Sequence, residues 1–98
     1  MREVKSVIRF DYDSSNNTSM QVIVKAFKAV SKIFDIFENT SGVSLKDPTF
    51  SNVIENGVST VIIEAFVIQD EDNADIGSDV CEIAARETGA IAYTYNIL

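Results

Sequence analysis

The chain has 98 residues, and it contains no histidine, no tryptophan, one cysteine and one proline. Without histidine it lacks the commonest general base and the commonest metal ligand, so catalytic triads that need an imidazole are excluded. A single cysteine, Cys81, excludes an internal disulfide and fits a reducing compartment. The four glycines are widely spaced and form no phosphate-binding loop. We therefore expect no catalytic residue, no cofactor and no enzyme activity.

Long hydrophobic runs are absent as well. No stretch of 18 uncharged apolar residues is available to span a bilayer, and residues 1–10 lack the apolar core and cleavage site of a signal peptide. The composition, with 46% apolar and 23% charged residues, is that of a folded domain of common size. The sequence thus predicts one α+β domain over residues 1–98, located in the cytoplasm.

Basic residues are few, with 8 Lys and Arg against 15 Asp and Glu, and the net charge is −7. Such a balance repels nucleic acid and anionic membrane surfaces, so neither is expected as a partner. The charge is also unevenly distributed. Residues 1–46 carry seven bases and five acids, whereas residues 47–98 carry one base, Arg86, and ten acids. The second half of the chain supplies all of the net negative charge.

Residues 4–12 alternate between the two faces of a predicted strand. A helix is expected next, from a capping box of Thr18 and Gln21 to about Glu38. Its apolar residues form a stripe at helical spacing, namely Met20, Ile23, Val24, Phe27, Val30, Phe34 and Phe37. A second set widens the apolar arc, namely Val22, Ala26, Ala29, Ile33 and Ile36. An arc of this width predicts a helix that contacts more than one surface.

The second half of the chain is expected to hold three strands and a helix. Residues 49–54 form a short strand that Pro48 assigns to a sheet edge, and Asn56-Gly57 predicts a hairpin turn. Residues 58–69 are apolar on both faces and predict a central strand. A helix over residues 75–88 and a last strand over residues 90–98 complete the chain.

The order β-α-β-β-α-β is that of the ferredoxin-like fold, with four antiparallel strands and two helices on one face of the sheet. The other face would display an apolar patch, which a second copy of the chain is expected to cover. We predict a homodimer through this face, with Arg9 paired to Glu64 across the sheet. The predicted interface residues are Arg9, Ile62, Glu64, Phe66 and Ile68.

Acidic residues cluster in residues 70–75. The run lacks the spacing of a calcium loop. We expect the first and third strands to run parallel, which would bring Asp11 and Asp13 close to this run and allow a multi-carboxylate site. A solvated loop is the favoured interpretation, and no metal site is predicted. Carboxylates spaced along a loop and helix also imitate the phosphates of a nucleic acid, which predicts a basic protein surface as partner. The predicted partner-binding residues are Asp70, Glu71, Asp72, Asp75, Asp79 and Glu82.

The leading functional interpretation is a small acidic protein–protein interaction module. Its small size and its richness in Asn, Ile, Ser and Asp resemble accessory proteins of phages and mobile elements, which implies an inhibitor of a basic or nucleic-acid-handling host protein. One alternative is a dimeric regulatory or small-molecule-binding domain of the ferredoxin-like fold. Another is a dimeric α+β-barrel enzyme with a cavity lined by Tyr93, Tyr95, Arg9 and Glu64.

Overall fold

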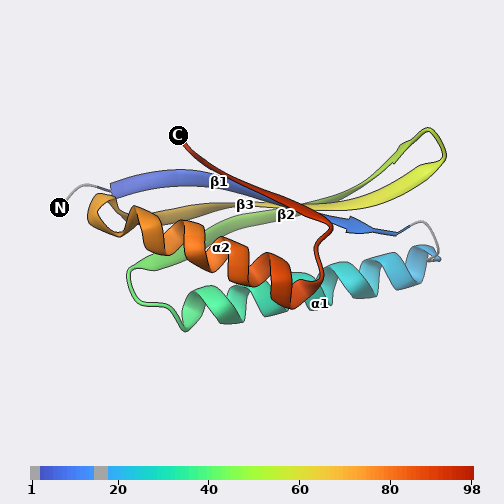
Figure 1. Ribbon diagram of the computed structural model, residues 1–98. Helices are drawn as coiled ribbons and strands as arrows, with labels where there is room; N and C mark the ends of the chain where they lie inside the picture. The colour runs from blue at the N-terminus through green and yellow to red at the C-terminus, as the bar shows by residue number, and fades with distance from the viewer. Residues whose placement is uncertain (1–2, 15–17) are drawn as a thin grey trace.

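The computed structural model describes residues 3–14 and 18–98. Its elements follow the predicted order (Figure 1). They are β1 (Glu3–Asp13), α1 (Ser19–Glu38), β2 (Val43–Glu55), β3 (Val58–Asp70), the short 3-10 helix η1 (Glu71–Asn73), α2 (Ala74–Thr88) and β4 (Ala92–Ile97).

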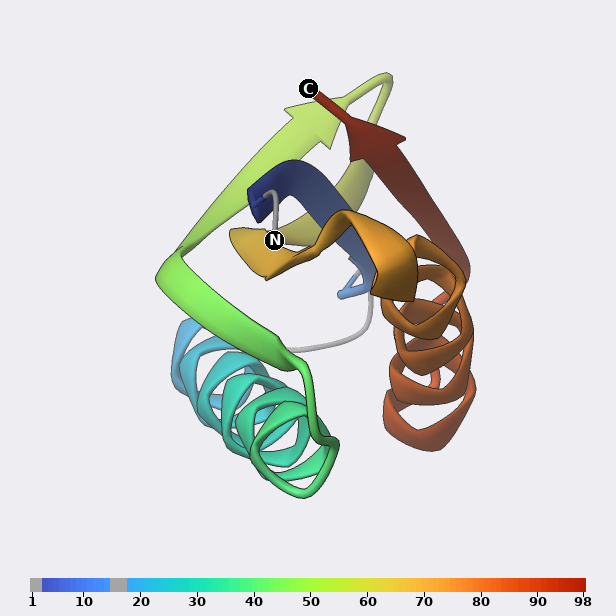
Figure 2. The same cartoon turned by 90° about the vertical axis from the view of Figure 1, so that its left-hand side faces the viewer.

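The four strands form one antiparallel sheet in the order β2-β3-β1-β4, and both helices cover the same face (Figures 1 and 2). The ferredoxin-like prediction is confirmed, including β1 and β3 at the centre and β2 and β4 at the edges. The helix α1 returns the chain to the end where β1 began, so β2 runs parallel to β1. The hairpin after β2 then makes β3 antiparallel to both.

This topology corrects one expectation. The strands β1 and β3 pair antiparallel, with Glu3 opposite Asp70 and Asp13 opposite Thr60. Asp11 and Asp13 therefore lie at the opposite end of the sheet from residues 70–75. The proposed approach of these two carboxylates to the acidic run was wrong, because it assumed parallel strands.

The core lies between the sheet and the two helices. The helix-side face of β1 and β3 contributes Ile8, Phe10, Tyr12, Val61, Ile63, Ala65 and Val67. The helices contribute Val22, Ala26, Ala29, Ile33, Phe37, Val80, Cys81, Ala84 and Ala85. Small residues on α2 allow this helix to lie close to the sheet, and a Cβ atom at Gly77 would clash with the side chains of Gln69 and Tyr95. Burial of this apolar surface is the main stabilising contribution to the fold.

The boundaries of α1 agree with the sequence. The Thr18 hydroxyl accepts a hydrogen bond from the Gln21 backbone N–H at 3.3 Å, and the Gln21 side chain accepts one from the Thr18 N–H at 2.8 Å. The capping box is therefore present, and the helix ends at Glu38 as predicted.

The strand β2 is longer than predicted, since it begins at Val43 and not at Thr49. Its pairing with β3 shifts between Lys46 and Thr49, where Asp47 has a φ of 51° next to Pro48. Two residues of β2 oppose one residue of β3 here, as in a β-bulge. The bulge interrupts the alternation of inward and outward residues along the strand. The sequence pattern therefore did not identify Val43 and Leu45 as part of it.

Candidate functional site

The helix α1 has two apolar faces, and only one of them packs on the sheet. Val22, Ala26, Ala29, Ile33 and Phe37 are buried in the core. The predicted main stripe turns out to face outward over the first half of the helix, with Met20 69% exposed and Phe27 67% exposed. The outward side chains of this half recur at i, i+3, i+4 and i+7, namely Met20, Ile23, Val24 and Phe27.

Two further exposed apolar side chains lie on the helix side of β2. Phe50 pairs with Ile63 and Ile54 with Ser59, which places both on the helix side of the sheet, and both are exposed. In Figure 2, α1 lies below β2, on the side of the molecule away from β4 and α2. We call this region the α1–β2 surface. It consists of Met20, Ile23, Val24, Phe27, Phe50 and Ile54.

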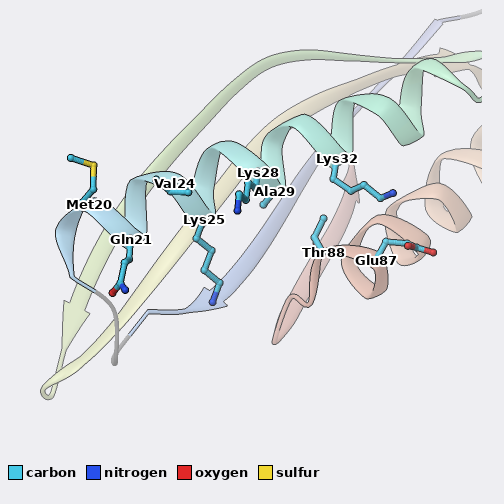
Figure 3. A pocket seen from close by; sticks show the side chains of 9 residues that line it. All are labelled: Met20, Gln21, Val24, Lys25, Lys28, Ala29, Lys32, Glu87 and Thr88. Carbon is cyan, nitrogen blue, oxygen red and sulfur yellow. The ribbon is translucent and has the colours of Figure 1, made fainter.

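The other flank of α1 borders a groove of about 520 Å³ beside the C-terminal end of α2 (Figure 3). Three lysines of α1 line it, Lys25, Lys28 and Lys32, together with Glu87 and Thr88 of α2. The Lys25 ammonium donates a hydrogen bond to the Asp13 carbonyl at 2.7 Å. The apolar part of the wall comes from Ala29 and from Met20 and Val24, which the groove shares with the α1–β2 surface. The groove is thus basic and partly apolar in a chain of net charge −7.

The predicted acidic residues lie on three successive elements. Asp70 ends β3 and accepts a hydrogen bond from the Asp72 N–H at 3.2 Å, and Glu71 and Asp72 belong to η1. The exposed acids of α2, Asp75, Asp79 and Glu82, are spaced at i, i+4 and i+7 and share one helix face. Across residues 3–14 and 18–98, no group of three or more His, Cys, Asp or Glu side chains is placed to hold a metal ion.

The open face of the sheet is less apolar than expected. Ile62 is only 8% exposed, while Phe66 and Ile68 are half-buried. The Lys5 ammonium lies 4.1 Å from the centroid of the Phe66 ring and covers it with a cation–π contact. The residues predicted to form a dimer interface thus share one face, and their role in a dimer stays a prediction.

Arg9 lies directly opposite Glu64 across the sheet, as predicted, but its ion pair is with a different residue. Its guanidinium pairs with Asp11, two residues along the same strand, with Nε 2.8 Å from the carboxylate. Residues i and i+2 of a strand lie on one face, so Asp11 competes with Glu64 for the same arginine. The hydrogen bond and charge of Asp11 raise the Arg9 pKa most, and Glu64 contributes less.

Three of the four residues of the proposed enzyme cavity, Arg9, Glu64 and Tyr93, line one pocket, whereas Tyr95 does not. Tyr95 pairs with Ile8, which assigns it to the helix side of the sheet. The Tyr95 hydroxyl is instead bound within the core, where it accepts hydrogen bonds from Ser6 at 3.1 Å and from the Gln69 amide. Neither Ser6 nor Gln69 was expected to be buried from the sequence, because polar residues at inward strand positions carry no distinct pattern.

No helix in the described part of the chain is long and apolar enough to cross a membrane. Nor does the sequence itself point to relatives, since no family model and no curated protein matches it.

Comparison with solved structures identifies the fold. A putative amidohydrolase/peptidase from Burkholderia cenocepacia aligns with 98% of this chain and 27% of its own, at 9% identity and a TM-score of 0.52. A hydantoinase/carbamoylase family amidase from Burkholderia ambifaria aligns with 98% of this chain and 27% of its own, at 7% identity and a TM-score of 0.51. The C-terminal domain of a cyclometallase involved in the synthesis of the NPN cofactor of lactate racemase aligns with 99% and 56%, at 13% identity and a TM-score of 0.51.

The chain covers less than two thirds of each of these three proteins. At such low identity the likeness concerns the arrangement of strands and helices alone. It carries no catalytic residue over to this sequence.

Proposed function

We propose that the chain is a protein–protein interaction module and that its contact surface is the α1–β2 surface. The observation that carries the proposal is the second apolar face of α1. Four large apolar side chains at i, i+3, i+4 and i+7 point away from the core and remain exposed. A helix needs one apolar stripe to pack on its own sheet, and a second stripe of this kind marks an interaction site.

Exposed apolar side chains favour association because their transfer from water into an interface lowers the free energy. Single exposed apolar residues are common on protein surfaces, but a contiguous patch next to an open sheet edge promotes association. Phe27 is aromatic and Met20 is an unbranched apolar side chain. Both residue types are enriched at the centres of protein interfaces. Burial of side chains of this size against a partner stabilises a complex by roughly 1.5–3 kcal/mol each, before the costs of association.

A photo-crosslinking amino acid at position 27 tests this proposal in the native cell. We expect irradiation to join the chain covalently to a protein. The same amino acid at position 97, where Ile97 of β4 is 57% exposed, serves as the matched control and should give little product. Equal yields of protein adduct at the two positions, or none at either, would argue against the α1–β2 surface.

The acidic residues of η1 and α2 support a finer form of the proposal, in which the module binds a basic partner and inhibits a nucleic-acid-handling protein. Its support is the location of Asp75, Asp79 and Glu82 on one exposed helix face. This face belongs to α2, which lies beside α1 in the same helix layer (Figure 2).

The groove between α1 and α2 favours a second candidate function, the binding of a small amphipathic anion. Its volume of about 520 Å³ is in the range of small-molecule sites, and it combines an apolar wall with Lys28 and Lys32. Decanoate is a suitable probe, because it offers a carboxylate and an alkyl chain. We expect decanoate to raise the melting temperature of the wild type more than that of a Lys28→Glu/Lys32→Glu variant. Equal shifts in the melting temperatures of the two proteins would contradict decanoate binding in the groove.

A further inference from the structure

The strand β2 stands at the end of the strand order, and α1 packs beside it. Its other edge has no strand neighbour in the part of the chain that the structure describes. An open edge invites a further strand, and an adjoining apolar surface favours one that brings its own apolar helix. We propose that the occupant of the α1–β2 surface is a second copy of this chain, paired through β2 in an antiparallel, two-fold arrangement. This inference rests on the proposed function and names its partner.

The charges of β2 fit such a pairing. In a two-fold arrangement centred on Ser51, Ser51 meets its own copy and Thr49 lies opposite the partner's Val53. Lys46 then lies opposite the partner's Glu55, and the same contact occurs a second time by symmetry. Both residues are on the open side of the sheet, since Lys46 pairs with Phe66 and Glu55 with Val58 within the chain. Opposite charges facing one another across strands stabilise the pair.

The irregularity at residues 47 and 48 is compatible with this register. Within the chain, Asp47 and Pro48 together oppose one residue of β3. In the dimer they would oppose one residue as well, the partner's Ile54. Pro48 has no N–H to donate, so a register that needs a hydrogen bond from position 48 is disfavoured. In the register centred on Ser51 the proline lies in the bulge, and pairing resumes at Lys46.

The helices meet in the same arrangement. Ser51 lies about 26 Å along β2 from Val43, and Gln21 lies about 26 Å along α1 from Glu38, at rises of about 3.3 Å and 1.5 Å per residue. The loop between Glu38 and Val43 joins the two elements at that end. Measured along the two elements, an axis through Ser51 is therefore level with the first half of α1, where the exposed face lies. The two copies of α1 would lie on the same side of the joined sheet, each on the outer side of its molecule below β2 (Figure 2).

Isologous contact explains why one face is both apolar and uncharged at its centre. The six residues of the α1–β2 surface carry no charge, so two copies face each other without burying an unpaired ion. A basic partner, by contrast, would find no acid on this surface. The charged residues of β2 are Lys46, Asp47 and Glu55, and the two-fold register brings Lys46 and Glu55 together while Asp47 lies in the bulge.

Sedimentation velocity across a dilution series tests the inference, with charge variants of β2. We expect a dimer of twice 10.8 kDa for the wild type. Lys46→Glu and Glu55→Lys should each weaken association about tenfold or more by placing like charges opposite one another. An equimolar mixture of the two variants should regain association, because each unlike pair then forms across the interface. The two residues are nine positions apart on one extended strand, so a rescue by mixing cannot arise within one chain.

A wild type that stays monomeric at all concentrations would overturn the inference, and so would a mixture that associates no better than its parts. The crosslinker at position 27 separates this failure from failure of the proposed function. A product of the chain with itself supports both. A product with a different protein keeps the interaction module and overturns the second copy as its partner. Absence of any protein product contradicts both.

Discussion

The thiol of Cys81 lies in the core, fully buried, with its sulfur 3.9 Å from the Thr94 carbonyl. Burial raises the pKa of this thiol from its ordinary value to about 12, because the thiolate would lose its hydration. Cys81 thus packs in the core with Ala84 and Ala85 as a small apolar side chain. Burial also raises the pKa of Tyr12, in spite of the 2.6 Å hydrogen bond to Thr88.

These shifts predict that the chain loses stability at alkaline pH. Above pH 9 the Cys81 thiol ionises in the unfolded chain but stays protonated in the folded one up to about pH 12. The unfolded state then binds fewer protons, so the free energy of unfolding falls as pH rises, by up to about 1.4 kcal/mol per pH unit for one proton. Urea denaturation at pH 8.5 and pH 10.5 should show a larger loss for the wild type than for Cys81→Ala. Equal losses would mean that the thiol is accessible to solvent in the native state.

The helix α1 shows how far periodicity predicts structure at the level of an element. The capping box at Thr18 and the end at Glu38 were both predicted, because local hydrogen bonds determine them. The two apolar faces were also visible in the sequence. Which of them packs on the sheet was not, since both sets have helical spacing and the choice depends on the tertiary contacts of small residues such as Ala26 and Ala29. The site was therefore missed, although its residues had been identified.

Substitutions on the two faces of α1 should have different costs. Ile33 is buried, and Ile33→Ala should lower the free energy of unfolding by about 2–5 kcal/mol because it leaves a cavity. Phe27→Ala removes a larger side chain but should cost less than about 1 kcal/mol, because the ring is solvated in the single chain. Urea denaturation at submicromolar concentration, where association is suppressed, measures both. A cost for Phe27→Ala that matches the cost for Ile33→Ala would place the ring inside the core.

For the other elements, too, some features were predicted from the sequence and others were not. The hairpin at Asn56-Gly57 and the edge position of β2 followed from turn chemistry and from Pro48. The extra length of β2 did not, because a bulge breaks the alternation that identifies a strand. The relative direction of β1 and β3 is a property of the whole sheet, and an error there misplaced Asp11 and Asp13 relative to the acidic run.

The whole molecule combines an apolar flank on α1, a basic groove between the helices and an acidic face on α2. The charge difference between the halves of the sequence thus becomes a difference between the two helices of one layer (Figures 1 and 2). The composition predicted the difference. Composition does not tell which charged surface binds a partner, because exposed charges that are merely solvated have the same pattern.

Reversing the acidic face should separate binding from stability. A variant with Asp72→Lys, Asp75→Lys and Asp79→Lys should lose any basic partner while the melting temperature changes little, because these side chains are exposed. Affinity capture at two salt concentrations, with the wild type as reference, measures the effect. A matched control is Lys28→Glu, which changes charge on the other helix. An unchanged set of captured proteins would leave the acidic face without a role in binding.

The most direct measurement of the α1–β2 surface is its solvent accessibility in solution, read by NMR from the paramagnetic broadening that a soluble agent causes. In the single chain Met20 and Phe27 are far more exposed than Ile76 and Ile83 of α2. If a second copy covers α1, the signals of Met20 and Phe27 should be protected at millimolar concentration, while those of Ile76 and Ile83 broaden. The strongest broadening at Met20 and Phe27 would contradict the proposal, because this face would then be free in solution.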